Sequence, residues 1–439
     1  MMIKRYRTFS MLKLGIVLIL CGLGQSVSAQ EGDPSAVDDF FNEINELAEQ
    51  ESIVNAFNFI EEIDSKTTEE LIMLTEIPAP PFQEERRAQK YSEMLQEAGA
   101  DSVWIDEVGN VLALRKGTER NRTVALNAHL DTVFPEDTDV TVEARGDTLY
   151  APGIGDDTRG LMVVLTVLRA MEHENLQTKD DLIFVGTVGE EGLGDLRGVK
   201  HLFEEQGPGI DSWIAVDGGS IGRIVNQALG SHRYRVTFEG PGGHSWGSFG
   251  LANPAHALGK AMHYFSLEAD AFTQDGPRTS YNVGRINGGT SVNSIPFETW
   301  MEVDMRSVSN ENLEQIDEIL QKSVQKALDE ENEMRRRGPE LTVDVEMIGN
   351  RPSGEIDSET PLVQRAMSTA QFFDSESSLT RSSTDSNIPI SLNIPAVTIG
   401  RGGAGGNGHS LNEWWLNKDG HLAIQRALLL LVSEAGLSQ

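Results

Sequence analysis

A histidine and an aspartate follow an apolar segment that has the composition of a buried strand. His129 and Asp131 come directly after Thr123 to Asn127, and open α/β sheets bind their ligands at the carboxyl ends of strands. Side chains two residues apart on a strand point the same way. A neutral imidazole beside a carboxylate that orients it fits a metal site. For this pair taken alone, an ordinary hydrogen bond at a strand end is the alternative.

Two pairs of adjacent acids add to this pattern. Asp156 and Asp157 lie in a glycine-rich turn that opens a helical segment, and Glu190 and Glu191 follow the apolar strand Leu182 to Val188. In such a pair, one carboxylate can bind a metal while its neighbour transfers a proton. An aspartate at the start of a helix is also a common N-cap. The turn by itself therefore leaves both roles open.

Asp217 and His409 complete the set of residues that could do this chemistry. Asp217 ends the apolar segment that begins at Trp213, and His409 follows a strand that ends at Gly400. Oxygen and imidazole ligands suit zinc, cobalt or manganese. Cysteine ligands do not enter, because Cys21 is the only cysteine in the sequence. We therefore expect a metal site at the carboxyl edge of a sheet.

A serine-based site is the non-metal alternative. Residues 243–247 match the G-x-S-x-G nucleophile elbow with Ser245 as the nucleophile, and Asp385 and His409 follow in the chain order of α/β-hydrolases. An elbow requires a helix that starts almost at the serine, whereas no helical pattern begins there. The serine hypothesis also gives the two acid pairs no role. A metal-binding protein without catalytic activity is a further alternative, and Glu190 argues against it.

The segments that position these residues alternate between short apolar strands and helices. This alternation predicts an α/β fold with a mostly parallel sheet flanked by helices. It stops near residue 231 and resumes past residue 350, so we predict a discontinuous catalytic domain of residues 63–230 and 350–439. The expected strands are Val111 to Arg115, Thr123 to Asn127, Leu182 to Val188, Trp213 to Asp217 and Ala396 to Gly400, and the expected helices are Thr67 to Thr75, Glu85 to Ala98, Gly160 to Glu172, Val199 to Glu205, Thr360 to Phe372 and Gly420 to Glu434.

Residues 231–349 follow a different order, which predicts an inserted domain. The pattern reads strand, helix, strand, strand, helix, strand, the β-α-β-β-α-β order of ferredoxin-like folds. Its expected elements are Tyr234 to Glu239, Pro254 to Leu267, Ser280 to Ile286, Thr299 to Arg306, Glu311 to Met334 and Thr342 to Ile348.

The first 29 residues have the pattern of a signal peptide. Four cations between Lys4 and Lys13 precede the apolar run Leu14 to Leu23, and a small-residue cleavage site ends at Ala29. The run is about ten residues long, whereas a membrane-spanning helix needs roughly twenty. We expect export to the periplasm or the extracellular space after cleavage near Ala29. Lipidation of Cys21, the only route to a membrane in this sequence, is the alternative.

The composition is that of an acidic globular protein. The 439 residues, 39% apolar and 24% charged, are enough for two domains and exclude a wholly disordered chain. A net charge of −32 argues against nucleic acid or an anionic membrane as partners. Acidic residues are frequent in residues 30–62, which we expect to form a helical N-terminal segment.

The motifs resemble those of the M20 family of metallopeptidases, which includes tripeptide aminopeptidases, dipeptidases, carboxypeptidases and N-acyl-amino-acid deacylases. The resemblance runs from about Thr67 to Leu431, and its motifs occur in the family order. At Thr158-Arg159 the sequence departs from the family, where many members have one lysine before the glycine, and this weakens assignment to a subfamily. The matching motifs are 129–135 (HLDTVFP), Gly155-Asp156-Asp157, Glu190-Glu191, Asp217, Gly242-Gly243-His244-Ser245 and Gly408-His409-Ser410.

By position, the resemblance implies a site for two divalent metal ions, with Zn2+ expected first and Co2+ or Mn2+ as alternatives. Asp156, rather than Asp157, is expected to bridge the ions, which leaves Asp157 as a helix cap or a supporting group. The resemblance also implies that Glu190 is the general base and that Asp131 orients a histidine ligand. The implied ligands are His129 and Asp217 for one ion, Glu191 and His409 for the other, and Asp156 for both.

In the inserted domain, the resemblance implies roles for three residues. His244 is expected to reach an active site, often that of a partner subunit, and to stabilise the oxyanion of the tetrahedral intermediate. Asn293 and Arg306 resemble positions that hold a substrate's carboxylate or carbonyl group. An exposed loop position is the alternative for His244, and a strand-end ion pair is the alternative for Arg306. The resemblance thus implies that this domain acts as a lid and mediates dimerisation, because His244 would reach the active site of the second subunit of a homodimer.

Short peptides and acyl-amino acids are the substrate classes that the resemblance implies. In the family, aspartate at the position of Asp217 tends to accompany aminopeptidases and dipeptidases, whereas glutamate tends to accompany carboxypeptidases and deacylases. We therefore expect a secreted di- or tripeptide aminopeptidase. Carboxypeptidase or N-acyl-amino-acid deacylase activity is the alternative.

Overall fold

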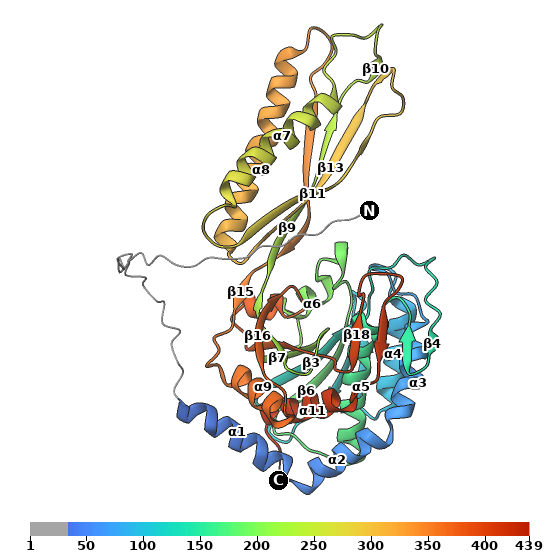
Figure 1. Ribbon diagram of the computed structural model, residues 1–439, viewed down its shortest axis with the longest axis vertical. Helices are drawn as coiled ribbons and strands as arrows, with labels where there is room; N and C mark the ends of the chain where they lie inside the picture. The colour runs from blue at the N-terminus through green and yellow to red at the C-terminus, as the bar shows by residue number, and fades with distance from the viewer. Residues whose placement is uncertain (1–33, 439) are drawn as a thin grey trace, which may run out of the picture.

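The computed structural model describes residues 34–438, with side chains from residue 39 onward. A broad body and a narrower domain are stacked along the longest axis, and the chain crosses twice between them (Figure 1). The expected signal peptide, its cleavage site at Ala29 and Cys21 lie outside the described residues. Within residues 34–438, no helix combines the length and the apolar character needed to cross a membrane.

A nine-stranded mixed sheet forms the centre of the larger body. Its strands are β1 (Ser102–Ile105), β2 (Val111–Arg115), β3 (Thr123–His129), β6 (Asp181–Thr187), β7 (Ser212–Val216), β8 (Arg223–Ala228), β15 (Gly354–Glu355), β16 (Ser378–Ser382) and β17 (Ala396–Ile399). The order is β1-β2-β6-β3-β7-β17-β8-β15, and β16 pairs with β8. The central strands β6, β3, β7 and β17 are parallel, so the carboxyl ends of β3, β6 and β7 meet at one edge. The predicted α/β fold is confirmed, although β1, β2 and β15 add antiparallel pairs.

Helices pack against this sheet and bury its faces. The first to follow the N-terminal segment are α3 (Asp64–Thr75) and α4 (Glu85–Glu97), and the others are α5 (Arg159–His173), α6 (Arg197–Leu202), α9 (Pro361–Phe372), α10 (Asn387–Ser391) and α11 (His421–Ala435). α5 and α11 contact β3 and each other, and α9 contacts β17. Both α5 and α11 are apolar on nearly every side, as expected of helices enclosed by other elements.

A small second sheet lies beside the carboxyl edge of the main one, and the sequence pattern did not predict it. Its antiparallel strands are β4 (Glu143–Arg145), β5 (Thr148–Tyr150), β18 (Ala404–Gly406) and β19 (Trp414–Leu416), in the order β18-β19-β5-β4. Each strand is only three residues long, too short for an alternation of apolar and polar residues to stand out. This sheet joins two segments that are distant in sequence and that carry Asp156 and His409.

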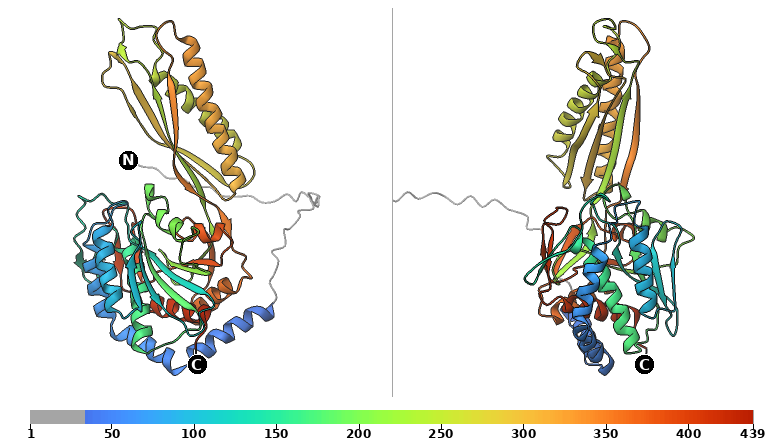
Figure 2. Two further views of the ribbon diagram at one scale, coloured as in Figure 1. Left: turned by 180° about the vertical axis from the view of Figure 1, so that it is seen from behind. Right: turned by 90° about the vertical axis from the view of Figure 1, so that its right-hand side faces the viewer.

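The narrower domain has the predicted ferredoxin-like order. Its main elements are β9 (Gly230–Glu239), α7 (Pro254–Phe272), β11 (Thr279–Gly288), β13 (Glu298–Ser307), α8 (Asn310–Met334) and β14 (Thr342–Arg351), with the short strands β10 (Gly243–His244) and β12 (Ser294–Ile295) at the far tip. The sheet order is β11-β13-β9-β14. α7 and α8 cover one face of the sheet, and the domain projects away from the main body (Figure 2). It has its own core, which includes Val236, Phe265, Met301 and Leu320.

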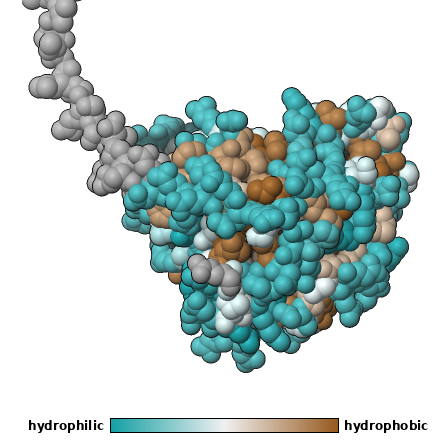
Figure 3. Space-filling model, turned by 90° about the horizontal axis from the view of Figure 1, so that it is seen from below, coloured by the Kyte–Doolittle hydropathy of each residue, from teal (hydrophilic) through white to brown (hydrophobic). Residues whose placement is uncertain are grey.

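The acidic N-terminal segment forms two helices, α1 (Pro34–Ala48) and α2 (Glu51–Glu62), rather than one. α1 packs against α9 and α11, and α2 packs against α5 and α11. Ile44, Ile53 and Ile60 are fully buried in these contacts. Seen from the side where these helices lie, the surface is mainly hydrophilic with scattered apolar patches (Figure 3). The segment is therefore part of the packed main body.

Candidate metal centre

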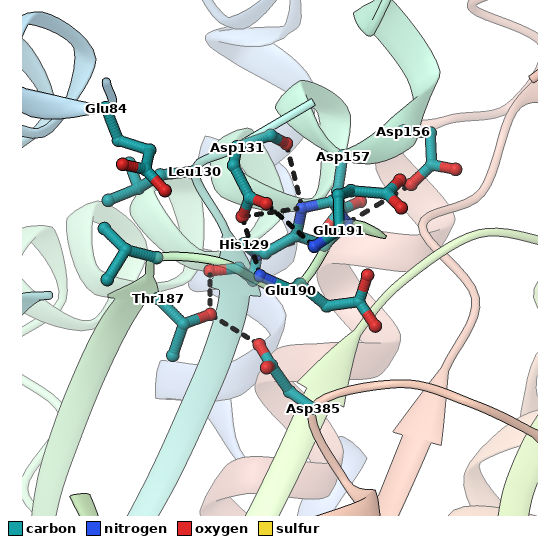
Figure 4. Close-up of polar contacts among 12 residues, drawn as sticks. Glu84, His129, Leu130, Asp131, Asp156, Asp157, Thr187, Glu190, Glu191 and Asp385 are labelled. Atoms are coloured by element: carbon teal, nitrogen blue, oxygen red, sulfur yellow. Dashed lines mark hydrogen bonds and ion pairs between the residues drawn. The ribbon is translucent and has the colours of Figure 1, made fainter. Parts of the chain in front are cut away.

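Three parallel strands deliver chemically active residues to one edge of the sheet. His129 is the last residue of β3, Glu190 and Glu191 follow the end of β6, and Asp217 follows β7 directly. The close-up shows His129, Asp131, Glu190 and Glu191 gathered above the strand ends (Figure 4). Because β6, β3 and β7 are neighbours in the sheet, the spacing of these side chains is fixed by the register of the strands.

Asp156 lies between two histidines, with one carboxylate oxygen directed at each. His129 Nε2 is 3.2 Å from Asp156 Oδ1, and His409 Nε2 is 3.3 Å from Asp156 Oδ2. His409 Nε2 is also 2.9 Å from Glu191 Oε1. Ligand atoms of His129, Asp156 and Glu191 all lie within 4.8 Å of one another. His129, Asp156 and Glu191 are therefore close enough together to hold a metal ion.

His409 lies on a different element from the one that the sequence suggested. Asp156 belongs to an irregular turn, Ile154–Thr158, that leads into α5. His409 does not follow the end of β17 directly, because the loop after β18 carries it, and its φ angle is 61°. Its place in the centre therefore depends on the small second sheet, in which β19 pairs with both β18 and β5.

Asp131 holds the centre together from a fully buried position. Its side chain is 0% exposed, and its two oxygens accept hydrogen bonds from the backbone N–H groups of Glu190 (2.9 Å) and Glu191 (2.8 Å). The Nδ1 atom of His129 is 3.0 Å from the carbonyl oxygen of Asp131 and 3.7 Å from its carboxylate. Asp131 thus orients both a histidine and the loop of the acid pair.

Asp157 and Asp217 lie next to the compact group rather than within it. Asp157 is fully buried, and its carboxylate accepts hydrogen bonds from the N–H groups of Gly160 and His129, which is the supporting role expected of it. Asp217 faces the same cavity as Asp156 and Glu191. Burial and the charge of Asp156 both raise the pKa of Asp217.

The electrostatics of this group fit the binding of divalent cations. Burial raises the pKa of Glu190 well above its usual range, and the charge of Glu191 adds to the effect while Arg351 opposes it. Hydrogen bonds to Asp156 and Glu191 raise the pKa of His409 to about 10. Burial would raise the pKa of Asp156, but hydrogen bonds from His129 and His409 lower it. Clustered carboxylates and imidazoles, once the imidazoles have lost their extra protons, match the donor set that zinc would take.

Two residues of the site were missed by sequence reasoning. Glu413 is buried, and its carboxylate accepts hydrogen bonds from the N–H groups of Gly153, Gly155 and Asp156, each at 2.9 Å. It fixes the turn that presents Asp156. A single glutamate beside two tryptophans gives no signal of this role in the sequence.

The second missed residue is Arg351, at the end of β14. It is 4% exposed, its Nη1 atom is 3.1 Å from Glu190 Oε1, and its Nη2 atom donates to the carbonyl oxygen of Glu190. Arg351 also donates to the Ser383 hydroxyl at 2.9 Å. It holds the proposed general base from the side of the inserted domain, and no motif marked it in advance.

A cavity of about 560 Å³ opens beside the centre. Its walls come from both domains. The lining residues that carry a charge or an imidazole are Asp156, Glu190, Glu191, Asp217 and His409 on the metal side, and Arg223, Arg233, Arg306 and Arg351 around them. A concave site of this size suits a small molecule.

Of the three residues expected from the inserted domain, only Arg306 reaches this cavity. His244 and Asn293 are exposed at the far tip of the domain, where the Asn293 carbonyl accepts a hydrogen bond from the N–H of Ser245 at 2.9 Å. They lie together, yet neither lines the cavity of its own chain. The position of β10 at the end remote from the main body shows this separation (Figure 1).

The serine hypothesis does not fit the geometry. Ser245 is at the tip of the inserted domain, while Asp385 is buried in the main body and accepts hydrogen bonds from Thr187 and Asn127. His409 contacts Asp156 and Glu191 instead. The three residues of that triad therefore do not meet within the chain.

The fold and the site together define a two-domain α/β protein with an acid and histidine centre at the carboxyl edge of its sheet. The sequence profile of peptidase family M20/M25/M40 matches residues 125–432. This is well over half of the chain, so the protein belongs to that family. The resemblance inferred from the motifs is confirmed.

Two similar proteins are named as a desuccinylase and a deacetylase. The succinyl-diaminopimelate desuccinylase of Corynebacterium glutamicum is 26% identical over 251 residues, 55% of this chain and 66% of that protein. The N-acetylcysteine deacetylase of Bacillus subtilis is 22% identical over 262 residues, 57% of this chain and 67% of that protein. The chain thus spans about two thirds of the length of these two relatives.

Solved structures of similar fold include two peptidases. Aminopeptidase PepT from Bacillus cereus has a TM-score of 0.65 at 20% identity, covering 84% of this chain and 98% of that one. The dipeptidase Dug1p from Saccharomyces cerevisiae has a TM-score of 0.67 at 17% identity, covering 87% and 98%. At these identities, the likeness establishes the fold alone.

Proposed function

We propose that the protein is a hydrolase of short peptides that uses two divalent metal ions, zinc first among them. The observation that carries this proposal is the position of Asp156, whose two carboxylate oxygens each face a different histidine. His129 and Asp217 would hold one ion, and Glu191 and His409 the other. Two ions in such a site polarise the scissile carbonyl and lower the pKa of a water molecule.

Glu190 is our candidate for the residue that moves the proton in this reaction. It is 6% exposed and lines the cavity next to the ligands, and its raised pKa suits a group that accepts a proton and gives it up again. We propose that its carboxylate takes a proton from the attacking water and returns it to the leaving nitrogen. Arg351 and the buried Asp131 keep this carboxylate and its backbone in place.

The size and charge of the cavity support a di- or tripeptide as the substrate. A cavity of about 560 Å³ leaves little room for a longer chain, and Arg306 could hold the terminal carboxylate of a short peptide through paired hydrogen bonds. We propose aminopeptidase activity on such peptides, on the basis of the aspartate at position 217.

Removal of an N-acyl group from an amino acid is the second candidate. One observation favours it: among the described residues, every carboxylate that lines the cavity is either a proposed metal ligand or Glu190. No further acid is present there to receive the ammonium group of a free amino terminus. Carboxypeptidase activity on a peptide with a blocked amino terminus has the same advantage, because such a substrate carries no ammonium group.

We further propose that His244 acts in the site of a partner subunit within a homodimer. His244 is exposed at a tip that also exposes Trp246 (87%), Phe249 (68%) and Val292 (103%). Exposed apolar side chains of this size are typical of contact surfaces.

Export after cleavage near Ala29 is likewise our proposal, based on the N-terminal sequence alone, and sequencing the amino terminus of the mature protein tests it.

Activity after metal removal and a variant of Glu190 test the main proposal. Chelation should abolish hydrolysis, and added Zn2+ should restore it. Glu190→Ala should remove turnover while the metal content stays at that of the wild type, because Glu190 moves the proton and does not hold the ions. Near wild-type turnover in that variant contradicts the proposal. A panel of tripeptides, their N-acetylated forms and N-acyl amino acids separates the two substrate candidates.

A further inference from the structure

Two arginines of the inserted domain share a single carboxylate on the wall of the cavity. Arg233 on β9 is the register partner of Asp304 on β13, and Arg306 lies two residues further along β13. Arg233 Nε is 3.0 Å from Asp304 Oδ1, and Arg306 Nε is 2.9 Å from Asp304 Oδ2. Both guanidinium groups line the cavity. The single negative charge of Asp304 therefore pairs with two positively charged arginines at this wall.

Donor groups remain on these two arginines after their contacts with the protein are made. Arg233 Nη1 donates to the carbonyl oxygen of Gly192. In the part of the chain that the structure describes, Arg233 Nη2 and both Nη atoms of Arg306 have no hydrogen-bond partner. Arg306 is 38% exposed and Arg233 is 15% exposed at the side chain. The free donors of two adjacent guanidinium groups can thus reach a molecule in the cavity.

The remaining charges of the cavity do not cancel this excess. Arg223 donates to the backbone carbonyl of Asp217 and not to a carboxylate, and Arg351 is paired with Glu190. Metal ions bound by the three acidic ligands of the centre would neutralise those acids. With metal ions bound, the cavity of this acidic protein, whose net charge is −32, would therefore be locally cationic.

We propose that the substrate carries two carboxylates, one held by Arg306 and the second by Arg233. This inference rests on the proposed function and adds to it the chemical class of the substrate. Guanidinium groups bind carboxylates through charge-assisted hydrogen bonds, which are stronger than those that a neutral amide can accept. An uncharged side chain placed beside Arg233 would give its free donor no charged acceptor, which disfavours such substrates.

Matched substrate pairs and one matched control variant test the second carboxylate. The pairs are leucyl-glutamate with leucyl-glutamine, and N-succinyl-leucine with N-succinamoyl-leucine, in which a carboxylate is replaced by an amide of the same shape. In at least one pair the dicarboxylate should have a kcat/KM higher by about tenfold or more. The pair that responds tells whether the second carboxylate lies on the leaving side or on the acyl side.

Arg233→Gln should bring that ratio close to one, whereas Arg235→Gln should leave it unchanged. Arg235 is the next outward residue on the same face of β9, where it contacts Glu302 and stacks on Trp300, and it does not line the cavity. Ratios near one for both pairs in the wild type overturn the proposal, as does an unchanged ratio in Arg233→Gln. If Arg233→Gln fails to fold, Arg233→Lys is measured by the same ratio and should lower it.

Calorimetry with glutarate separates this proposal from the proposed function. If the neutral amides are cleaved as efficiently as their acidic partners, the proposed hydrolase function is retained and the proposed second carboxylate site is wrong. If no amide is cleaved, the proposed function fails. The zinc-loaded protein should then still bind glutarate about tenfold more tightly than its monomethyl ester, with the difference lost in Arg233→Gln. Equal binding of the two compounds overturns the anion site.

Discussion

The charge of His409 depends on whether a metal ion is bound. Its Nε2 atom contacts Asp156 and Glu191, and these contacts raise its pKa to about 10 from an ordinary value of 6.5. At about pH 7 the metal-free protein therefore carries a proton on this ring. A zinc ligand must be the neutral imidazole, so metal binding has to displace that proton.

We expect zinc binding near pH 7 to release at least one proton and to strengthen by up to about tenfold for each unit of rising pH. Calorimetry in buffers of different ionisation enthalpy measures the protons released. His409→Ala should release fewer. In the metal-free protein, the raised pKa of His409 makes the folded state less stable as the pH rises. The ion pairs of His409 contribute fully to stability below about pH 6.5, and this contribution is lost as the pH rises through about 10. A proton release of zero would contradict this account.

The sequence predicted the residues of the metal centre but not the residues that hold them. His129, Glu190, Glu191 and Asp217 follow long apolar strands, so their meeting at one edge is a consequence of strand direction. Glu413 and Arg351 come from segments without a motif, and their contacts with Asp156 and Glu190 depend on how distant parts of the chain pack. A local pattern carries no information about such contacts.

Among the elements, length decided what could be predicted. The 15-residue helix α5 and the seven-residue strands β3 and β6 have clear patterns and are found where they were expected. The three-residue strands β18 and β19 have none, yet they place His409. The N-terminal segment was expected to be acidic and helical, but its packing against α5, α9 and α11 of the main body was not predicted.

Two neighbouring residues of α2 give a direct test of that packing. Ile53 is 0% exposed, whereas Val54 beside it is 42% exposed. Ile53→Ala should cost about 2–5 kcal/mol because it removes buried methyl groups and leaves a cavity, and Val54→Ala should cost about 0.5 kcal/mol or less. The melting temperature should fall by several degrees for the first variant alone. Catalytic activity per folded molecule should be unchanged in both, since α2 adds no residue to the cavity.

At the scale of the whole molecule, the chain has two separate cores and one site between them. The main body holds the proposed ligands, and the inserted domain places Arg233 and Arg306 on the cavity wall. His244, Asn293 and the exposed Trp246 do not line this cavity, and the far end of the inserted domain lies well away from the main body (Figure 2). Our proposal that His244 takes part in the reaction therefore assigns it to the site of a second copy of the chain.

Mixing two inactive variants tests this arrangement. His244→Ala retains Glu190, and Glu190→Ala retains His244, so a mixed dimer contains one site in which both residues are present. With random pairing of equal amounts, half of the dimers are mixed, and activity should return to about a quarter of the wild-type value. Each variant alone should remain nearly inactive at any concentration. Mixtures that recover no activity after subunit exchange would place the action of His244 within its own chain, through a closure of the inserted domain onto the cavity.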